Sequence, residues 1–315
     1  MQKLQNLINS IKQLQSPIYI AGHVVPDDDS IGSCLSLAYL LTNLNKDCYV
    51  LLNPSDHNAL KSHDIKTLIT DTISHNDYTF ISLDLNENYR LDIFEEYYNN
   101  AKYTINIDHH QGNNTGADIV YTEDFASSTC EIIFKIIDAI SPELLSDKAL
   151  CKSLYTGILT DTKCFSKRLS PDTLVFVQRL LSSGIDYESI IKNTIHHRTM
   201  YQFKALAKLV NDLQFDSFHY AIIDTSLPEY CKLTHNDIVK ILAEEIRKIE
   251  NIDLLLILIK KPNCITAKVA SNITKNAHII AKHFGGGGHK GEAGFTTTLS
   301  TEEILNQTKE LIKTI

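Results

Sequence analysis

Residues 18–33 read Ile-Tyr-Ile-Ala-Gly-His-Val-Val-Pro-Asp-Asp-Asp-Ser-Ile-Gly-Ser, and a helical pattern follows them. The apolar run at the start predicts a short buried strand, so this stretch predicts a strand, a turn and a helix in succession. The turn holds one imidazole and two carboxylates, from His23, Asp27 and Asp29. We expect the intervening Asp28 to face solvent. An alternative interpretation is that His23 and Pro26 only shape the loop and that Asp29 or Ser30 caps the following helix.

Acidic and histidine side chains recur after other apolar runs of the chain. Asp84 closes the run 78–83, the triplet Asp108-His109-His110 closes the run 103–107, and Asp161 follows a helical stretch. Because the carboxyl ends of parallel strands share one edge of an open α/β sheet, these distant side chains are expected to converge there.

A cluster of this composition predicts bound metal ions. Five aspartates without counter-charge would repel one another, and unpaired buried carboxylates take up protons or cations. Carboxylate and imidazole ligands without thiolate favour Mn²⁺, with Mg²⁺ or Co²⁺ as substitutes. The donors exceed what one ion with an open position takes, which indicates two ions about 3.5–4 Å apart, as in phosphoester hydrolysis.

Periodicity along the chain predicts an α/β fold with two domains. Short apolar runs alternate with helical patterns in the first part, which predicts βα units and a mostly parallel sheet. Expected strands lie at 17–22, 47–52, 78–84 and 103–108, and expected helices near 3–15, 31–44, 58–69 and 90–98. Helices are expected from residue 127 to 213, and strands again at 218–223, 253–260 and 265–270. The expected division is a metal-binding domain 1–185, a helical linker 186–214 and a smaller α/β substrate-binding domain 215–315, with the active site in the interdomain cleft.

The segment that begins the helical part has two interpretations. Ser128 followed by Glu131 is typical of a capping box at a helix start. The same Ser-Ser-Thr segment, residues 127–129, is also a candidate for a role near the active site.

Composition and charge exclude several classes of protein. At 315 residues and a net charge of −8, the chain is long enough for two cores, and a broad track for long nucleic acid is disfavoured. The seven scattered cysteines include no Cys-x-x-Cys pair, which argues against a disulfide framework. No apolar run reaches the roughly 18 residues of a membrane span, and no signal-peptide pattern begins the chain. We expect a cytoplasmic protein.

A local cationic segment lies in the second half of the chain. Residues 254–291 contain no Asp or Glu but six lysines, among them Lys268 on an expected strand. Four glycines follow at 285–288, and such a run suits main-chain N–H groups that approach a phosphate closely. The candidate substrate contacts are Lys268, Gly286, Gly287, Gly288 and His289.

These motifs together resemble one known family. The turn His23-x-x-Pro26-Asp27-x-Asp29, the isolated Asp84, the Asp108-His109-His110 triplet and Thr160-Asp161-Thr162 are similar to the four motifs of the DHH phosphoesterases. Residues 285–294, Gly-Gly-Gly-Gly-His-Lys-Gly-Glu-Ala-Gly, resemble the signature of the DHH-associated C-terminal domain.

The resemblance implies a role for each site residue. One metal ion is held by His23, Asp27 and Asp84; the other is held by Asp29, Asp84, His109 and Asp161, with the Asp84 carboxylate bridging. Asp108 then orients a histidine. A hydroxide made available by the metals attacks phosphorus, while His110 contacts the phosphate or protonates the leaving oxygen.

Length and the glycine signature favour the nanoRNase and pAp phosphatase branch of this family. Its expected substrates are short oligoribonucleotides or dinucleotides such as pApA, and also pAp; a homodimer is compatible with the resemblance. The alternatives are a phosphodiesterase for cyclic dinucleotides or another small phosphate ester, and a catalytically weak nucleotide-binding regulator. Asn272, Lys163 and Glu292 depart from the residues usual in the branch, and these departures bear on substrate preference.

Overall fold

The computed structural model describes residues 2–15, 17–194, 199–223, 245, 249, 252–271, 277–288 and 291–314. It divides into two compact units, residues 1–197 and residues 198–315, and each is described by itself.

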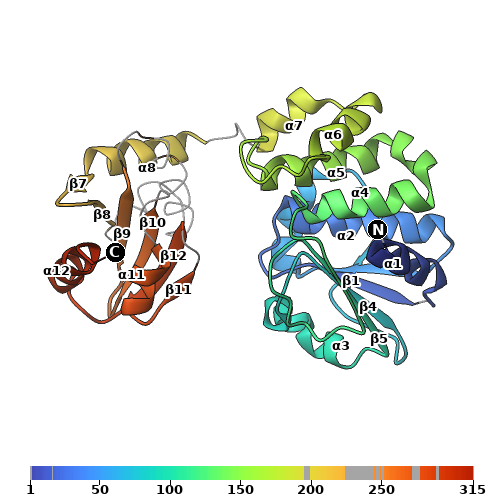
Figure 1. The fold of residues 1–315 in the computed structure, drawn as a ribbon, viewed down its shortest axis with the longest axis horizontal. Helices are drawn as coiled ribbons and strands as arrows, with labels where there is room; N and C mark the ends of the chain where they lie inside the picture. The colour runs from blue at the N-terminus through green and yellow to red at the C-terminus, as the bar shows by residue number, and fades with distance from the viewer. Residues whose placement is uncertain are drawn as a thin grey trace. The chain divides into compact units, whose positions relative to one another are not determined.

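The first unit is built on a six-stranded, entirely parallel sheet (Figure 1). Its strands are β1 (Ile18–Ala21), β2 (Cys48–Leu51), β3 (Leu68–Thr70), β4 (Thr79–Leu83), β5 (Tyr103–Asp108) and β6 (Ile119–Thr122). They lie in the order β3-β2-β1-β4-β5-β6. The order reverses between β1 and β4, and the crevice beyond the carboxyl ends of such a pair is the usual ligand site of an open sheet.

Helices cover both faces of this sheet. They are α1 (Gln2–Gln13), α2 (Asp28–Asn43), α3 (Glu95–Asn99), α4 (Thr129–Ile140), α5 (Lys148–Asp161), α6 (Thr173–Ser182) and α7 (Tyr187–Thr194), with 3-10 turns η1 (Pro54–Ser62), η2 (Asn88–Phe94) and η3 (Pro142–Ser146). The main core joins α1, α2, α4 and α5 to one face, and a smaller aromatic core joins η2 and α3 to the other. Helices α2, α4 and α5 therefore lie behind the strand ends that carry the candidate ligands.

Most expected elements are present in this unit, and one expectation was wrong. The strands expected at 17–22, 47–52, 78–84 and 103–108 are β1, β2, β4 and β5. The helix expected at 58–69 is instead the end of η1 followed by the strand β3. This strand has three residues, at the sheet edge and little buried, so it shows none of the periodicity by which a strand is found.

The second unit contains a mixed sheet in the order β11-β12-β10-β9-β8-β7. Its strands are β7 (Gln214–Phe215), β8 (His219–Ile223), β9 (Leu254–Lys260), β10 (Ile265–Ser271), β11 (Gly287–Gly288) and β12 (Glu292–Thr297), and its helices include α8 (Met200–Asn211), α11 (Ala277–His283) and α12 (Thr301–Ile312). Among the strands that the structure describes here, only β8 and β9 pair in parallel. The predicted α/β class, with a parallel-sheet first domain and a smaller α/β second domain, is confirmed.

The segment expected to link the domains contains two helices. The start of α7 packs on the core of the first unit through Ile190, whereas α8 packs on the second sheet through Ala205 and Leu209. The expected boundaries at residues 185 and 215 stay predictions. Within the described part of the chain, no helix is long and apolar enough to cross a membrane.

Candidate metal centre

The site begins at the two central strands of the first sheet. Strands β1 and β4 are paired along their length, so His23 and Asp84, which follow them, emerge side by side. His23 Nε2 lies 3.5 Å from Asp84 Oδ2. Asp84 has a φ of 61° and Val25 a φ of 52°, and such left-handed geometry is uncommon for non-glycine residues, above all for β-branched ones. Strained backbone of this kind concentrates at functional sites.

Asp27 completes a first group of candidate ligands. One ligand atom from each of His23, Asp27 and Asp84 lies within 4.8 Å of the others. Asp27 Oδ1 also accepts hydrogen bonds from the backbone N–H groups of Asp29 and Ser30, each at 3.1 Å. Asp27 is therefore the cap of α2, and Asp29 and Ser30, the caps in the alternative interpretation of this turn, are not.

A second group of candidate ligands surrounds His109. Its Nε2 lies 4.0 Å from Asp29 Oδ2, 3.7 Å from Asp161 Oδ2 and 3.4 Å from Asp84 Oδ1. The two carboxylate oxygens of Asp84 thus face different groups, Oδ2 toward His23 and Oδ1 toward His109. The structure brings together all six residues expected to bind metal.

The start of α4 holds two of these carboxylates in place. Asp29 accepts hydrogen bonds from the backbone N–H groups of Thr129, at 2.7 Å, and Cys130, at 2.8 Å. The Thr129 hydroxyl donates to Asp84 Oδ1 at 3.0 Å. The positive end of the helix dipole also favours carboxylates at this position. Thr129 is therefore a positioning residue. In the sequence, its only indication is that the Ser-Ser-Thr segment was a candidate for a role near the active site.

Both interpretations of the Ser-Ser-Thr segment hold in part. Ser128 caps α4 by accepting a hydrogen bond from the Glu131 N–H at 3.1 Å. The Glu131 carboxylate, however, accepts from the Ser127 hydroxyl at 2.6 Å, so the second half of the capping box is shifted by one residue. Ser128 therefore caps α4, and the next residue, Thr129, supports the candidate ligand Asp84.

Two glycines allow α2, α4 and α5 to approach closely. A Cβ on Gly157 of α5 would lie 2.4 Å from Cys130 Sγ and 3.0 Å from Asp29 Oδ1. A Cβ on Gly32 of α2 would lie 2.9 Å from the Ser153 carbonyl oxygen. Gly157 was not expected to matter, because a lone glycine inside a helical pattern gives no sign of what packs against it.

Asp108 orients the second histidine of the triplet, not the first. His110 Nδ1 lies 2.7 Å from Asp108 Oδ1, whereas His109 Nδ1 lies 3.4 Å from the Ala126 carbonyl oxygen. His110 Nδ1 is also 3.7 Å from Asp84 Oδ1, and its side chain is 33% exposed. Asp108 therefore holds Nδ1 of His110, while part of the His110 side chain remains exposed.

Asp28 does not face solvent freely as expected. Its Oδ1 lies 3.5 Å from Nε2 of the buried His63, whose Nδ1 lies 2.7 Å from the Ser153 hydroxyl. This link ties the start of α2 to α5. The sequence offers no signal for it, because His63 is distant in the chain from every motif.

The charges of the cluster shift the pKa values of its members in opposite directions. Burial raises the pKa of Asp29, and the nearby Asp84 and Asp161 raise it further. Burial alone would raise the pKa of Asp84 too, but contact with His109 and His23 outweighs it and lowers that pKa. Burial alone would lower the pKa of His109, yet Asp84 and Asp29 raise it to about 9. The crowded carboxylates of the cluster therefore favour a positive charge beside them.

These features fit divalent cations. Asp161 Oδ2 is buried and accepts no hydrogen bond from any residue that the structure describes. A buried carboxylate oxygen without a donor is costly unless a cation binds it. The donor set is carboxylate and imidazole, which suits Mn²⁺, Mg²⁺ or related ions.

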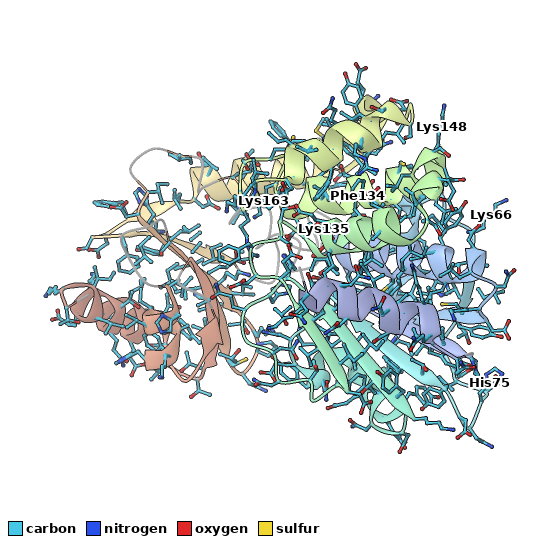
Figure 2. All side chains as sticks on the ribbon, turned by 45° about the vertical axis from the view of Figure 1, so that its right-hand side comes forward. Lys66, His75, Phe134, Lys135, Lys148 and Lys163 are labelled. Carbon is cyan, nitrogen blue, oxygen red and sulfur yellow. The ribbon has the colours of Figure 1, made fainter. Side chains whose placement is uncertain are left out.

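A left-handed turn follows Asp161 directly. Lys163, Cys164 and Phe165 have φ values of 47°, 56° and 62°. Lys163, two residues after the end of α5, is labelled in Figure 2. The Thr162 hydroxyl accepts from the Phe165 N–H at 3.1 Å and stabilises the turn. A glycine at position 163 would adopt this conformation without strain.

The candidate substrate contacts lie in the second unit. Lys268 on β10 forms an ion pair with Glu292 on β12. Gly287 and Gly288 form β11, and Gly286 precedes it. His289 and Asn272 lie outside the described residues, so their expected roles stay predictions.

Comparisons with known proteins agree with this geometry. The DHH family, N-terminal domain, matches residues 17–158, and the DHHA1 domain matches residues 224–315. The bifunctional oligoribonuclease and PAP phosphatase NrnA of Thermus thermophilus is 27% identical over 300 residues, which cover 94% of this chain and 88% of that protein. The cyclic-di-AMP phosphodiesterase GdpP of Bacillus subtilis is 24% identical over 98% of this chain, which spans 49% of the length of GdpP.

A solved structure shares the fold. The crystal structure of an exopolyphosphatase-related protein from Bacteroides fragilis matches with a TM-score of 0.84 at 20% identity, over 99% of this chain and 96% of the other. The family resemblance drawn from the motifs is thus confirmed by two domain matches in the expected order. The chain belongs to the DHH family of phosphoester hydrolases, with a DHHA1 domain as its C-terminal part.

Proposed function

We propose that this protein is a metal-dependent phosphodiesterase that hydrolyses dinucleotides such as pApA and other short oligoribonucleotides to mononucleotides, and that it also removes the 3′-phosphate of pAp. One observation carries the reaction type. Two groups of carboxylate and imidazole donors meet at the two oxygens of Asp84, as an arrangement for two bridged cations requires.

The first unit would hold the ions and the reacting phosphate. His23, Asp27 and Asp84 would bind one ion, and Asp29, His109 and Asp161 would bind the other together with Asp84. Bound divalent cations would supply a nucleophile at neutral pH and offset the charge that develops on the phosphoryl oxygens. Thr129 and the α4 backbone keep Asp84 and Asp29 in position for this.

His110 is the candidate for handling the leaving group. Its Nδ1 is held by Asp108, which directs the other ring nitrogen, Nε2, away from that carboxylate. In the protonated form, Nε2–H can donate to a phosphate oxygen or deliver a proton to the leaving oxygen. The partial exposure of His110 gives substrate access to this nitrogen.

The substrate class rests on charge and on relatives. A chain of net charge −8 disfavours long polyanions, whereas a short oligonucleotide carries few phosphates. The likeness to the NrnA protein of Thermus thermophilus extends over nearly the whole chain, which supports oligoribonucleotides and pAp as substrates. Lys268 and the glycines of β11 are the proposed phosphate contacts of the second unit.

Cyclic dinucleotides are the second candidate substrates. The likeness to the cyclic-di-AMP phosphodiesterase GdpP covers 98% of this chain, so both domains take part in it. A single panel separates the two proposals: purified protein with Mn²⁺ or Mg²⁺ is incubated with pApA, a short RNA, pAp and cyclic di-AMP, and products are resolved by chromatography. We expect AMP from pApA, short RNA and pAp. Turnover of cyclic di-AMP alone would favour the second candidate, and no product from any substrate would contradict both.

A further inference from the structure

The ion pair between Lys268 and Glu292 occupies one face of the second sheet. Lys268 on β10 is directly opposite Gly294 on β12, and Glu292 lies two residues before Gly294. Side chains two residues apart on a strand point to the same face. Lys268 and Glu292 therefore reach each other diagonally across neighbouring strands, at the distance where long side chains meet.

From Lys268 toward the edge strand β11, this face carries no side chain, although Ile257 on β9, on the other side of Lys268, packs in a core with α8. Gly294 is opposite Gly287 on the edge strand β11, so two glycines continue the row that begins with Lys268. A Cβ on Gly287 would meet no described atom within 4 Å, whereas one on Gly288 would lie 2.5 Å from the Ala293 Cα. Gly287 is thus the position where the backbone is open to a ligand.

Glu292 changes the electrostatic character of this row. Residues 254–291 contain no Asp or Glu, and Glu292 is the first acidic residue after them. Its side chain is 40% exposed and that of Lys268 is 33% exposed, so both remain accessible to a bound molecule. A carboxylate that engages the lysine reduces the attraction of the row for a phosphate dianion, and it adds an acceptor for hydroxyl groups.

We propose that Glu292 is a specificity-determining residue of this protein: through its ion pair with Lys268 it disfavours substrates that present an uncleaved terminal phosphate and favours those that present a hydroxyl. The inference deepens the proposed function and rests on it. The ratio of kcat/KM for pApA over ApA is then lower than in an enzyme that lacks this carboxylate. The ratio for pAp over 3′-AMP is lower for the same reason.

The expected effect is moderate because the pair is partly exposed. Interactions between exposed charges are screened by solvent and salt, so removal of one carboxylate should change selectivity about fivefold and not by orders of magnitude. The effect should shrink as the salt concentration rises, since the interaction that disfavours the phosphate is electrostatic.

The test compares matched substrates that differ by one terminal phosphate. The ratios of kcat/KM for pApA over ApA, and for pAp over 3′-AMP, are measured for the full chain and for Glu292→Gln. The control is Glu302→Gln, which removes the same charge from an exposed position at the start of α12. We expect both ratios to rise about fivefold in Glu292→Gln at low salt and to stay unchanged in the control. Equal ratios in all three proteins, or a fall in Glu292→Gln, would overturn the inference.

A binding measurement separates this inference from the proposed function. Calorimetric titration with AMP and with adenosine reports the preference for a terminal phosphate without turnover. If no substrate is cleaved but Glu292→Gln gains affinity for AMP and not for adenosine, the proposed function fails, and the effect of Glu292 on phosphate binding is present without it. If substrates are cleaved and the preference for AMP is the same in both proteins, the inference fails and the proposed function stands.

Discussion

The carboxylate cluster of the first unit and the glycine-lined row of the second unit are built in opposite ways. Asp29 and Asp84 are 1% and 2% exposed and are fixed by hydrogen bonds from α4. Lys268 and Glu292 are about a third or more exposed and fix mainly each other. The comparison teaches that the proposed metal ligands lie where buried groups are held by several contacts, whereas the proposed substrate contact lies where one side chain can change at little structural cost.

Asp84→Asn should give the largest effect in the molecule. The substitution removes the charge that both ligand groups share, so we expect metal affinity and turnover to fall at least about 100-fold, more than loss of a supporting contact gives. Calorimetry with Mn²⁺ and the substrate panel measure this. Circular dichroism should show an intact fold. If the variant keeps the wild-type Mn²⁺ affinity, Asp84 is not a ligand of the metal centre.

Thr129→Val tests how far the buried cluster depends on its supporting contacts. Valine keeps the shape but removes the hydrogen bond to Asp84, and such supporting contacts commonly change metal affinity about 10-fold or more. Thr129→Ser keeps the hydroxyl and should retain near-normal Mn²⁺ affinity. Normal Mn²⁺ affinity in Thr129→Val with a loss in Thr129→Ser would show that packing, and not the hydroxyl, is what matters.

Glu131→Gln tests the same region through the pH dependence of stability. Burial alone would raise the pKa of Glu131, but hydrogen bonds from Ser127, Ser170 and Thr173, with Lys135 nearby, outweigh it and lower the pKa. A lowered pKa means that this carboxylate stabilises the fold above its unfolded value of about 4.3 and loses that contribution as the pH falls further.

We therefore expect Glu131→Gln to lower the free energy of unfolding by about 2 kcal/mol at neutral pH. The difference from the wild type should narrow below about pH 4, because the wild-type carboxylate then becomes protonated. Urea denaturation at the two pH values measures both quantities. A difference that widens in acid would contradict the direction of the shift.

Lys163→Gly should give the smallest effect, and it compares Lys163 with Glu292, two of the three departures from the residues usual in the branch. The left-handed conformation costs a lysine about 1–2 kcal/mol, and the extra freedom of glycine in the unfolded chain offsets about half of this. We expect a gain of about 0.5–1 kcal/mol in stability, measured by thermal unfolding, with the pApA to ApA ratio unchanged. A changed ratio would show that Lys163, like Glu292, acts on substrate preference.

The sequence predicted the candidate ligands where acidic and histidine residues recur at the ends of strands. His23, Asp84 and the triplet Asp108-His109-His110 each follow an apolar run, and a parallel sheet brings such ends together whatever the loops do. The sequence was uninformative for Gly157, His63 and the partner of Asp108. Each of these depends on contacts between residues far apart in the chain, and no periodicity records such contacts.

By itself, the sequence determined the α/β class, the family and the set of side chains available for binding metal, because strand pattern and residue type are local properties. Only the tertiary structure decided that Asp84 faces both ligand groups, that α4 holds Asp29, and that Glu292 pairs with Lys268. Strand register and helix approach place these groups within a few ångströms, and both arise from the packing of the whole unit.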